Sequence, residues 1–152
     1  MNKLFEDCII MILSDETLTS TVEKILAIKD ILTTLYDQKI LNTNNYSNYQ
    51  QFIDILQLFI TILQNIQSHP GEEKYKKIKK TNKLFIRTIS GMEESIGILY
   101  QSGFEENMNN NTADGGSTNV ISSELIYKKK DLGLLYLVKS ILESIHSSFT
   151  QE

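Results

Sequence analysis

The sequence predicts a mostly α-helical domain of the α+β class. Apolar residues recur at helical spacing in six segments, and only one short segment, 120–127, suits a β-strand. The 152 residues include one proline and seven glycines, too few for a turn-dense all-β fold. A chain of this length forms one ordinary domain and buries roughly 70% of the surface that it exposes when unfolded.

Three helices are expected in the first half of the chain, over 3–13, 21–40 and 48–67. Ser20 precedes Glu23 by three positions, which is the spacing of a capping box at the start of the second helix. The third helix is apolar nearly all round, so other elements must surround it. We therefore expect 48–67 to be the central helix of the domain.

Three more helices are expected in the second half. The first, over 72–88, has a stripe with alternating steps of three and four residues and an otherwise lysine-rich surface; the stripe consists of Tyr75, Ile78, Asn82, Phe85 and Ile89. The next begins at Ser90, which has Glu93 three positions later, and ends at Gly103. A flexible loop over 107–119 and the strand precede a last helix over 131–147.

Composition and charge exclude several classes of function. The net charge of −4 gives no global attraction for nucleic acid or anionic lipid. The single cysteine, Cys8, rules out a disulfide within the chain and is typical of a reducing compartment. No apolar run reaches the roughly 20 residues of a membrane span, and the first residues do not form a convincing signal peptide. We expect a cytoplasmic or nuclear protein that binds neither nucleic acid nor membrane.

The residues also argue against catalysis and metal binding. His69, His146 and Cys8 lack the short paired spacings of a zinc site. Glycine-rich phosphate loops, nucleophile elbows and EF-hand loops are absent from the sequence. Adjacent glutamates at 72–73, 93–94 and 105–106 do not face one another on a helix. We therefore expect a protein that is not an enzyme and has neither metal nor cofactor.

One segment carries a longer pattern of polar residues. The run LQNIQSHPGEEKYKKIKKTNKLF, residues 63–85, contains an Asn near a helix end, a Pro turn and then Glu-Lys-Tyr-x-x-Ile-Lys-x-x-Asn-x-x-Phe. Gly103-Phe104 follows after a short helix. This pattern resembles the signature of the PUB (also called PUG) domain. It is most similar to the PUB domain of a UBX-domain cofactor of the AAA ATPase valosin-containing protein, and also similar to that of peptide N-glycanase.

The resemblance implies a compact helical fold with a small antiparallel β-sheet near the C-terminus. The strands would lie around 103–107 and 120–128, joined by an enlarged hairpin connection. Residues 46–152 would form the PUB-like domain, preceded by an extension over 1–45 with two extra helices.

The resemblance also implies a function and a site. PUB domains bind the acidic C-terminal tail of valosin-containing protein, which ends in a leucine followed by an aromatic residue, and connect this ATPase to the ubiquitin-proteasome pathway and ER-associated degradation. The chain would be a monomeric adaptor. Its implied peptide-binding residues are Asn65, Asn82, Lys79, Tyr75, Lys74, Gly103, Phe104 and Ile62. At the position of Ile62 several family members carry tyrosine, so the wall of the pocket would be aliphatic here.

Other interpretations stay open for several of these residues. Asn82 alternatively bonds the backbone of its neighbours, and core packing explains Tyr75 and Phe104 at least as well as ligand contact. The basic helix over 74–87 alternatively contacts nucleic acid or an anionic membrane. A hydrolase is compatible only with a longer natural chain that carries a catalytic domain.

Overall fold

The structure, a computed structural model, describes residues 3, 19–43, 45–107, 124–128 and 131–150. Apart from Lys3 and Asn107 at their edges, the helix predicted over 3–13 and the loop predicted over 107–119 lie outside these residues. The mostly α class with a small antiparallel sheet is confirmed. None of the helices in the described ranges is long and apolar enough to cross a bilayer.

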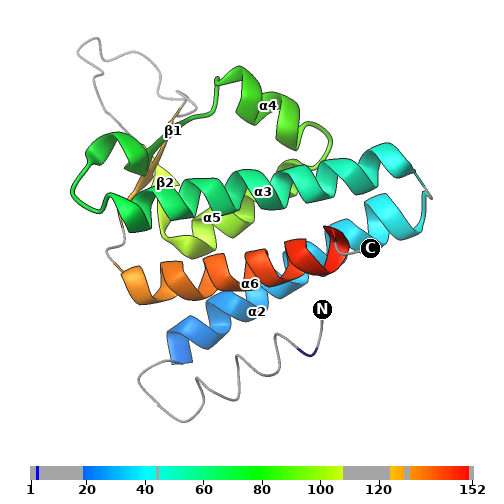
Figure 1. Ribbon diagram of the computed structural model, residues 1–152, viewed down its shortest axis with the longest axis horizontal. Coiled ribbons are helices and arrows are strands. Elements are labelled where there is room, and N and C mark those ends of the chain that lie inside the picture. Colours follow the sequence, from blue (N-terminus) through cyan, green and yellow to red (C-terminus); the bar gives the residue numbers. More distant parts are fainter. Residues whose placement is uncertain (1–2, 4–18, 44, 108–123, 129–130, 151–152) are drawn as a thin grey trace, which may run out of the picture.

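Helix α3 (Tyr46–Ser68) is the central helix that the apolar run 48–67 predicted. Its first turn is capped by Asn45, whose side-chain oxygen accepts a hydrogen bond from the Ser47 amide at 2.9 Å. Figure 1 shows α3 between α4 (Lys83–Ile89) on one side and α6 (Leu132–Thr150) on the other. α3 therefore has neighbours on two sides, but it is not surrounded as its apolar run predicted. One face of it is polar and exposed and consists of Gln50, Asp54, Gln57, Thr61 and Gln64.

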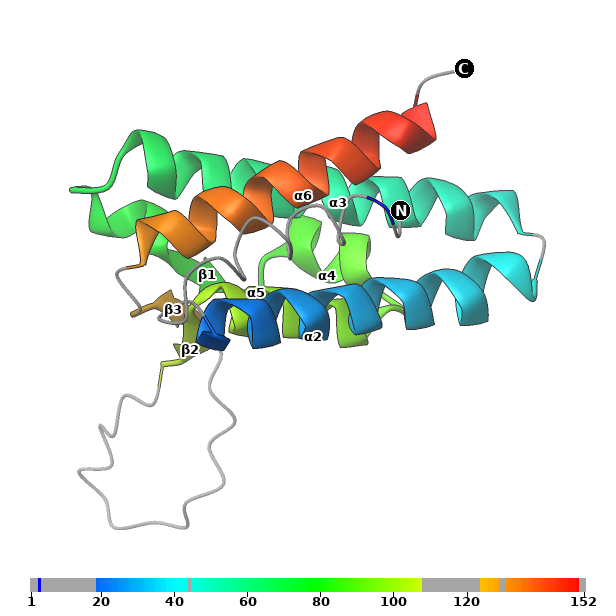
Figure 2. The same cartoon turned by 90° about the horizontal axis from the view of Figure 1, so that it is seen from below.

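Two long helices complete the core beside α3. α6 packs along α3 and buries one face of its own, and α2 (Thr19–Leu35) packs against α5 (Ile96–Ser102) on the other side of the molecule (Figure 2). A π-helical turn, Tyr36–Leu41, continues α2, so the two together account for the helix predicted over 21–40. α2 contributes buried side chains to the same hydrophobic core as α3 and α6; they are Val22, Ile25, Ile28, Leu32 and Leu35.

The prediction of a single helix over 72–88 is wrong. In its place are a 3₁₀ turn (Glu73–Lys76), a short strand β1 (Lys77–Lys79) and the seven-residue helix α4. Within β1 only Ile78 is buried, while its two lysine neighbours are exposed, which is the alternation of a strand. Residues 77–79 form a strand because they pair with another strand that is distant in the sequence. The local pattern of residues gives no sign of this pairing.

The helix predicted to begin at Ser90 begins later. Ser90 ends α4, a 3₁₀ turn follows over Glu93–Ser95, and α5 starts at Ile96. The Glu93 carboxylate does bond a nearby backbone amide, but it accepts from Gly91 at 2.9 Å instead of from Ser90. Gly103 ends α5 with φ 120°, as predicted, because this left-handed conformation favours glycine.

The sheet has three strands, one more than expected. β2 (Phe104–Glu106) and β3 (Glu124–Tyr127) confirm the strands predicted near 103–107 and 120–128. The strand order is β1-β3-β2 and both pairings are antiparallel, with Ile78 opposite Leu125 and Phe104 opposite Tyr127. The sheet lies at the end of the bundle where α3 ends (Figures 1 and 2).

Truncation of a buried residue in α2 tests whether this helix belongs to the folded unit or to a separate extension. Leu32 is fully buried, so we expect Leu32→Ala to lower the free energy of unfolding by about 2–5 kcal/mol. Leu26, on the same helix and 40% exposed, is the control, and Leu26→Ala should cost about 0.5 kcal/mol or less. Urea unfolding followed by circular dichroism measures both. An unchanged midpoint in Leu32→Ala would mean that residues 46–150 fold independently of α2.

Candidate functional site

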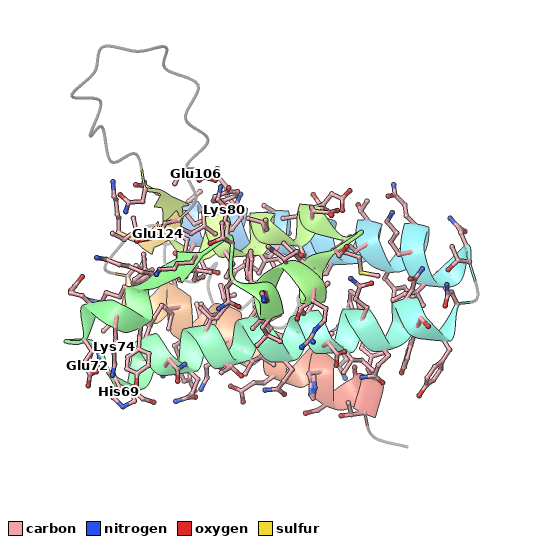
Figure 3. The ribbon with its side chains drawn as sticks, turned by 90° about the horizontal axis from the view of Figure 1, so that it is seen from above. His69, Glu72, Lys74, Lys80, Glu106 and Glu124 are labelled. Atoms are coloured by element: carbon pink, nitrogen blue, oxygen red, sulfur yellow. The ribbon has the colours of Figure 1, made fainter. Side chains whose placement is uncertain are left out.

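The C-terminal end of α3 carries a cluster of ring and charge contacts, which we call the α3-end cluster: Asn65, His69, Glu72, Lys74 and Tyr75. The rings of His69 and Tyr75 are tilted by 30° to each other with centroids 4.7 Å apart, and Lys74 Nζ lies 5.0 Å from the Tyr75 ring centroid. The backbone amide of His69 donates to the Asn65 carbonyl at 3.0 Å, and Lys74 pairs with Glu72 at 3.5 Å. Figure 3 shows His69, Glu72 and Lys74 together at this helix end. The structure thus brings together three of the predicted residues, Asn65, Lys74 and Tyr75, with His69, which the sequence did not single out.

Asn82 is the N-cap of α4. Its Oδ1 accepts a hydrogen bond from the Phe85 amide at 3.1 Å, so the oxygen serves the local backbone, as one interpretation of the sequence held. The side chain is exposed, and its amide NH₂ group has no hydrogen-bond partner among the described residues. Asn82 therefore keeps a helix in place with one atom and offers two donor hydrogens with another.

Lys79 is exposed on β1 and has no ion-pair partner within the ranges that the structure describes. The same holds for Lys77, Lys83 and Arg87, whereas Lys76 pairs with Glu73 and Lys80 with Glu106. A row of cations without carboxylate partners thus follows β1 and α4. The single basic helix over 74–87, on which the nucleic-acid and membrane interpretation depended, is absent, because these lysines are divided among a turn, a strand and a short helix.

Gly103 and Phe104 lie apart from this surface. Phe104 is 1% exposed and its ring packs against Tyr127 with centroids 5.5 Å apart, while the Gly103 carbonyl accepts from the Lys128 amide at 3.2 Å. Core packing is therefore what Phe104 does in this structure. Ile62 is half-buried at the edge of the same core, one turn before Asn65 on α3.

A hollow of about 500 Å³ lies between α3 and α4, and we call it the α3–α4 groove. It is lined by Gln51, Asp54, Gln57, Leu58, Thr61, Leu84, Arg87 and Thr88. None of the eight predicted residues lines it, but Thr61 is next to Ile62 and Leu84 follows Asn82 by two positions. The sequence carried a signal that the predicted stripe passed over: Leu84 and Ile86 flank Phe85, and both are about half exposed.

A network of three side chains joins Lys80, the residue after β1, to β2 and α5. Lys80 Nζ lies 2.8 and 2.7 Å from the two carboxylate oxygens of Glu106, and the Tyr100 hydroxyl donates to the same carboxylate (Figure 3 labels the first two). Burial, and then the hydrogen bond and charge of Glu106, raise the pKa of Tyr100 to about 12. The network fixes the end of β1 next to the exposed cations.

Residues 49–132 match the model of the PUB domain family. The match begins in α3, ends at the start of α6 and covers more than half of the chain. The chain belongs to the PUB domain family. PUB domains are protein-interaction modules, so the resemblance seen in residues 63–85 is confirmed at the level of the family. No curated protein and no solved structure shows significant similarity to the chain.

The stability of this PUB domain should depend on one side-chain oxygen, the Oδ1 of Asn82 that caps α4. Asn82→Ala leaves the Phe85 amide without its acceptor, and we expect the free energy of unfolding to fall by about 1 kcal/mol. Asn82→Ser keeps an acceptor oxygen and should lose only a few tenths of that amount. Thermal unfolding of the two variants side by side makes the comparison, and equal stability of Asn82→Ala and wild type would contradict the cap.

The Tyr100–Glu106 contact predicts a late-ionising tyrosine. The Tyr100 pKa rises from about 10 to about 12 on folding, so the protonated phenol stabilises the fold below pH 10, and this contribution is lost as the pH rises from 10 to 12. In an ultraviolet titration of tyrosinate absorbance, Tyr100→Phe should remove one tyrosine from the late step. Glu106→Gln should move that step toward lower pH. A Tyr100 that ionises together with exposed tyrosines would contradict this contact.

Proposed function

We propose that this PUB domain is a peptide-binding adaptor that docks the acidic C-terminal tail of the AAA ATPase valosin-containing protein, and that it thereby links this ATPase to ubiquitin-dependent and ER-associated degradation. The observation that carries the proposal is the row of unpaired cations on β1 and α4, beside an asparagine with a free amide group. An acidic peptide is the ligand that such a surface attracts, even though the chain as a whole is net acidic.

Each predicted residue then has a distinct role. The NH₂ group of Asn82 donates to a carbonyl or carboxylate of the tail, and Lys79 pairs with a tail carboxylate. Ile62 and Tyr75 provide apolar surface for the leucine and the aromatic residue, and Asn65 and Lys74 border them. Gly103 and Phe104 support the site indirectly, because they set the position of β2 and, through β3, that of β1.

The expected affinity is moderate. Burial of a leucine and an aromatic ring contributes about 1.5–3 kcal/mol each, and each hydrogen bond to a charged group a similar amount. Ordering a peptide and losing its translational freedom cost several kcal/mol. A net binding free energy of roughly −7 to −8 kcal/mol corresponds to a micromolar Kd, which suits a transient adaptor.

Calorimetric titration with a peptide of the ATPase tail tests this function. Asn82→Ser retains the helix cap but lacks the NH₂ donor, so we expect it to bind the tail about five- to 150-fold more weakly, the equivalent of ~1–3 kcal/mol. Lys79→Glu should also weaken binding, and its effect should shrink at high salt.

Two controls keep the result specific. Lys29→Glu makes the same change of charge on α2 and should leave tail binding unchanged. Heparin at moderate salt serves as the competing polyanion. Wild-type protein that binds heparin but shows no heat with the tail would overturn the proposal and favour a nucleic-acid or membrane partner.

A further inference from the structure

Hydrogen bonds between α3 and the end of α4 fix one end of the α3–α4 groove. Gln51 Nε2 on α3 donates to the Thr88 carbonyl at 2.9 Å and to the Ser90 carbonyl at 2.6 Å, so it bonds the backbone where α4 ends. These bonds hold α4 against α3 at this end. The two helices therefore do not need to rearrange before a ligand binds in the groove.

The walls of the groove combine apolar surface with a free cation. Leu58 from α3 and Leu84 from α4 line it, and Leu84 is 52% exposed. Arg87 lines the same hollow, and Lys83 lies one turn before it on α4; neither forms an ion pair within the part of the chain that the structure describes. On the opposite wall Asp54 accepts from Gln50 Nε2 at 3.1 Å. Two unpaired cations against one hydrogen-bonded carboxylate favour an acidic ligand.

The groove continues the proposed tail site along α3. With a rise of about 1.5 Å per residue, Leu58 lies about 10 Å and Asp54 about 16 Å along the helix from Asn65. An extended peptide advances about 3.3 Å per residue. A peptide that has one residue beside Asn65 therefore places its third neighbour at Leu58 and its fifth neighbour near Asp54 and Arg87.

We propose that the α3–α4 groove binds the peptide segment immediately upstream of the tail residues, an inference that rests on the proposed function. An aliphatic side chain about three residues upstream packs between Leu58 and Leu84. An acidic side chain about five residues upstream pairs with Arg87. The ligand is then an acidic peptide of about eight residues, and Arg87 selects for charge well away from the terminal residues.

Three synthetic probes test the length and charge of the ligand. The short probe has only the last four residues of a tail that ends in leucine and an aromatic residue. Two ten-residue probes share this ending and a leucine three positions upstream of the residue that lies beside Asn65. They differ only at positions four to six upstream, where one has glutamates and the other glutamines.

We expect wild type to bind the glutamate probe about three- to fivefold more tightly than the glutamine probe at low salt, the range of one exposed ion pair. Arg87→Gln should bind the two long probes with equal affinity. Arg87→Lys should keep part of the preference, and Asp54→Asn should enlarge it, because it removes a negative charge from the groove. Amide shifts of Leu84 and Thr88 should move with the long probes only. Circular dichroism melting verifies that every variant is folded.

Two results would overturn the inference and differ from failure of the proposed function. Equal binding of the two long probes to wild type, with the short probe still bound, would mean that upstream residues do not enter the groove. A glutamate preference that persists in Arg87→Gln would assign the selection to other cations. Absence of binding by all three probes would overturn the proposed function itself, and this inference with it.

Discussion

Burial of α3 is the constraint on which the rest of the structure depends. Phe52, Leu56, Phe59, Leu63 and Ile66 form one stripe and are at most 1% exposed. Ile53 and Ile55 are also buried and widen this stripe on its two sides, so the helix needs more than one neighbour. α6 covers one side along much of its length, but α4 has only seven residues and covers another side in part. A helix as short as α4 is not stable alone; its cap and the burial of Phe85 and Ile89 keep it in place. The α3–α4 groove exists because a long helix is covered by a short one.

The fold was predictable where the local pattern has one solution. Helix α3 and the end of α5 at Gly103 follow from an unbroken apolar run and from one residue that tolerates positive φ. The segment from Tyr75 to Ile89 has two solutions, because its apolar spacing fits a helix while Lys77-Ile78-Lys79 also fits a strand. The choice depends on Leu125, which pairs with Ile78 from 47 positions later in the sequence. Such non-local pairing leaves no trace in the periodicity of the segment itself.

The candidate site was predictable in its residue types more than in its geometry. The motif identified Asn82 and Lys79, and both lie on the exposed surface, but one sequence cannot show that an amide oxygen is already used by a helix while the amide nitrogen is free. No role in the site was predicted for His69, although its ring packs against that of Tyr75. Conversely, Phe104 also belongs to the motif, but it is buried and packs against Tyr127, so it supports the sheet beneath the candidate site. A recurring motif mixes residues that touch a ligand with residues that support them, and only the packing separates the two kinds.

The pairing of β2 with β3 has a consequence for the length of the chain. Glu106 lies opposite Leu125, and the Asn107 amide donates to the Glu124 carbonyl at 2.8 Å, so the sheet itself holds the two ends of the connection over residues 108–123. Once such a connection is long, each doubling of its length costs only about 0.6 kcal/mol in closure entropy. Evolution or an engineer can therefore insert a reporter domain or a second recognition motif between these strands, and α3 with its covering helices will keep the same geometry.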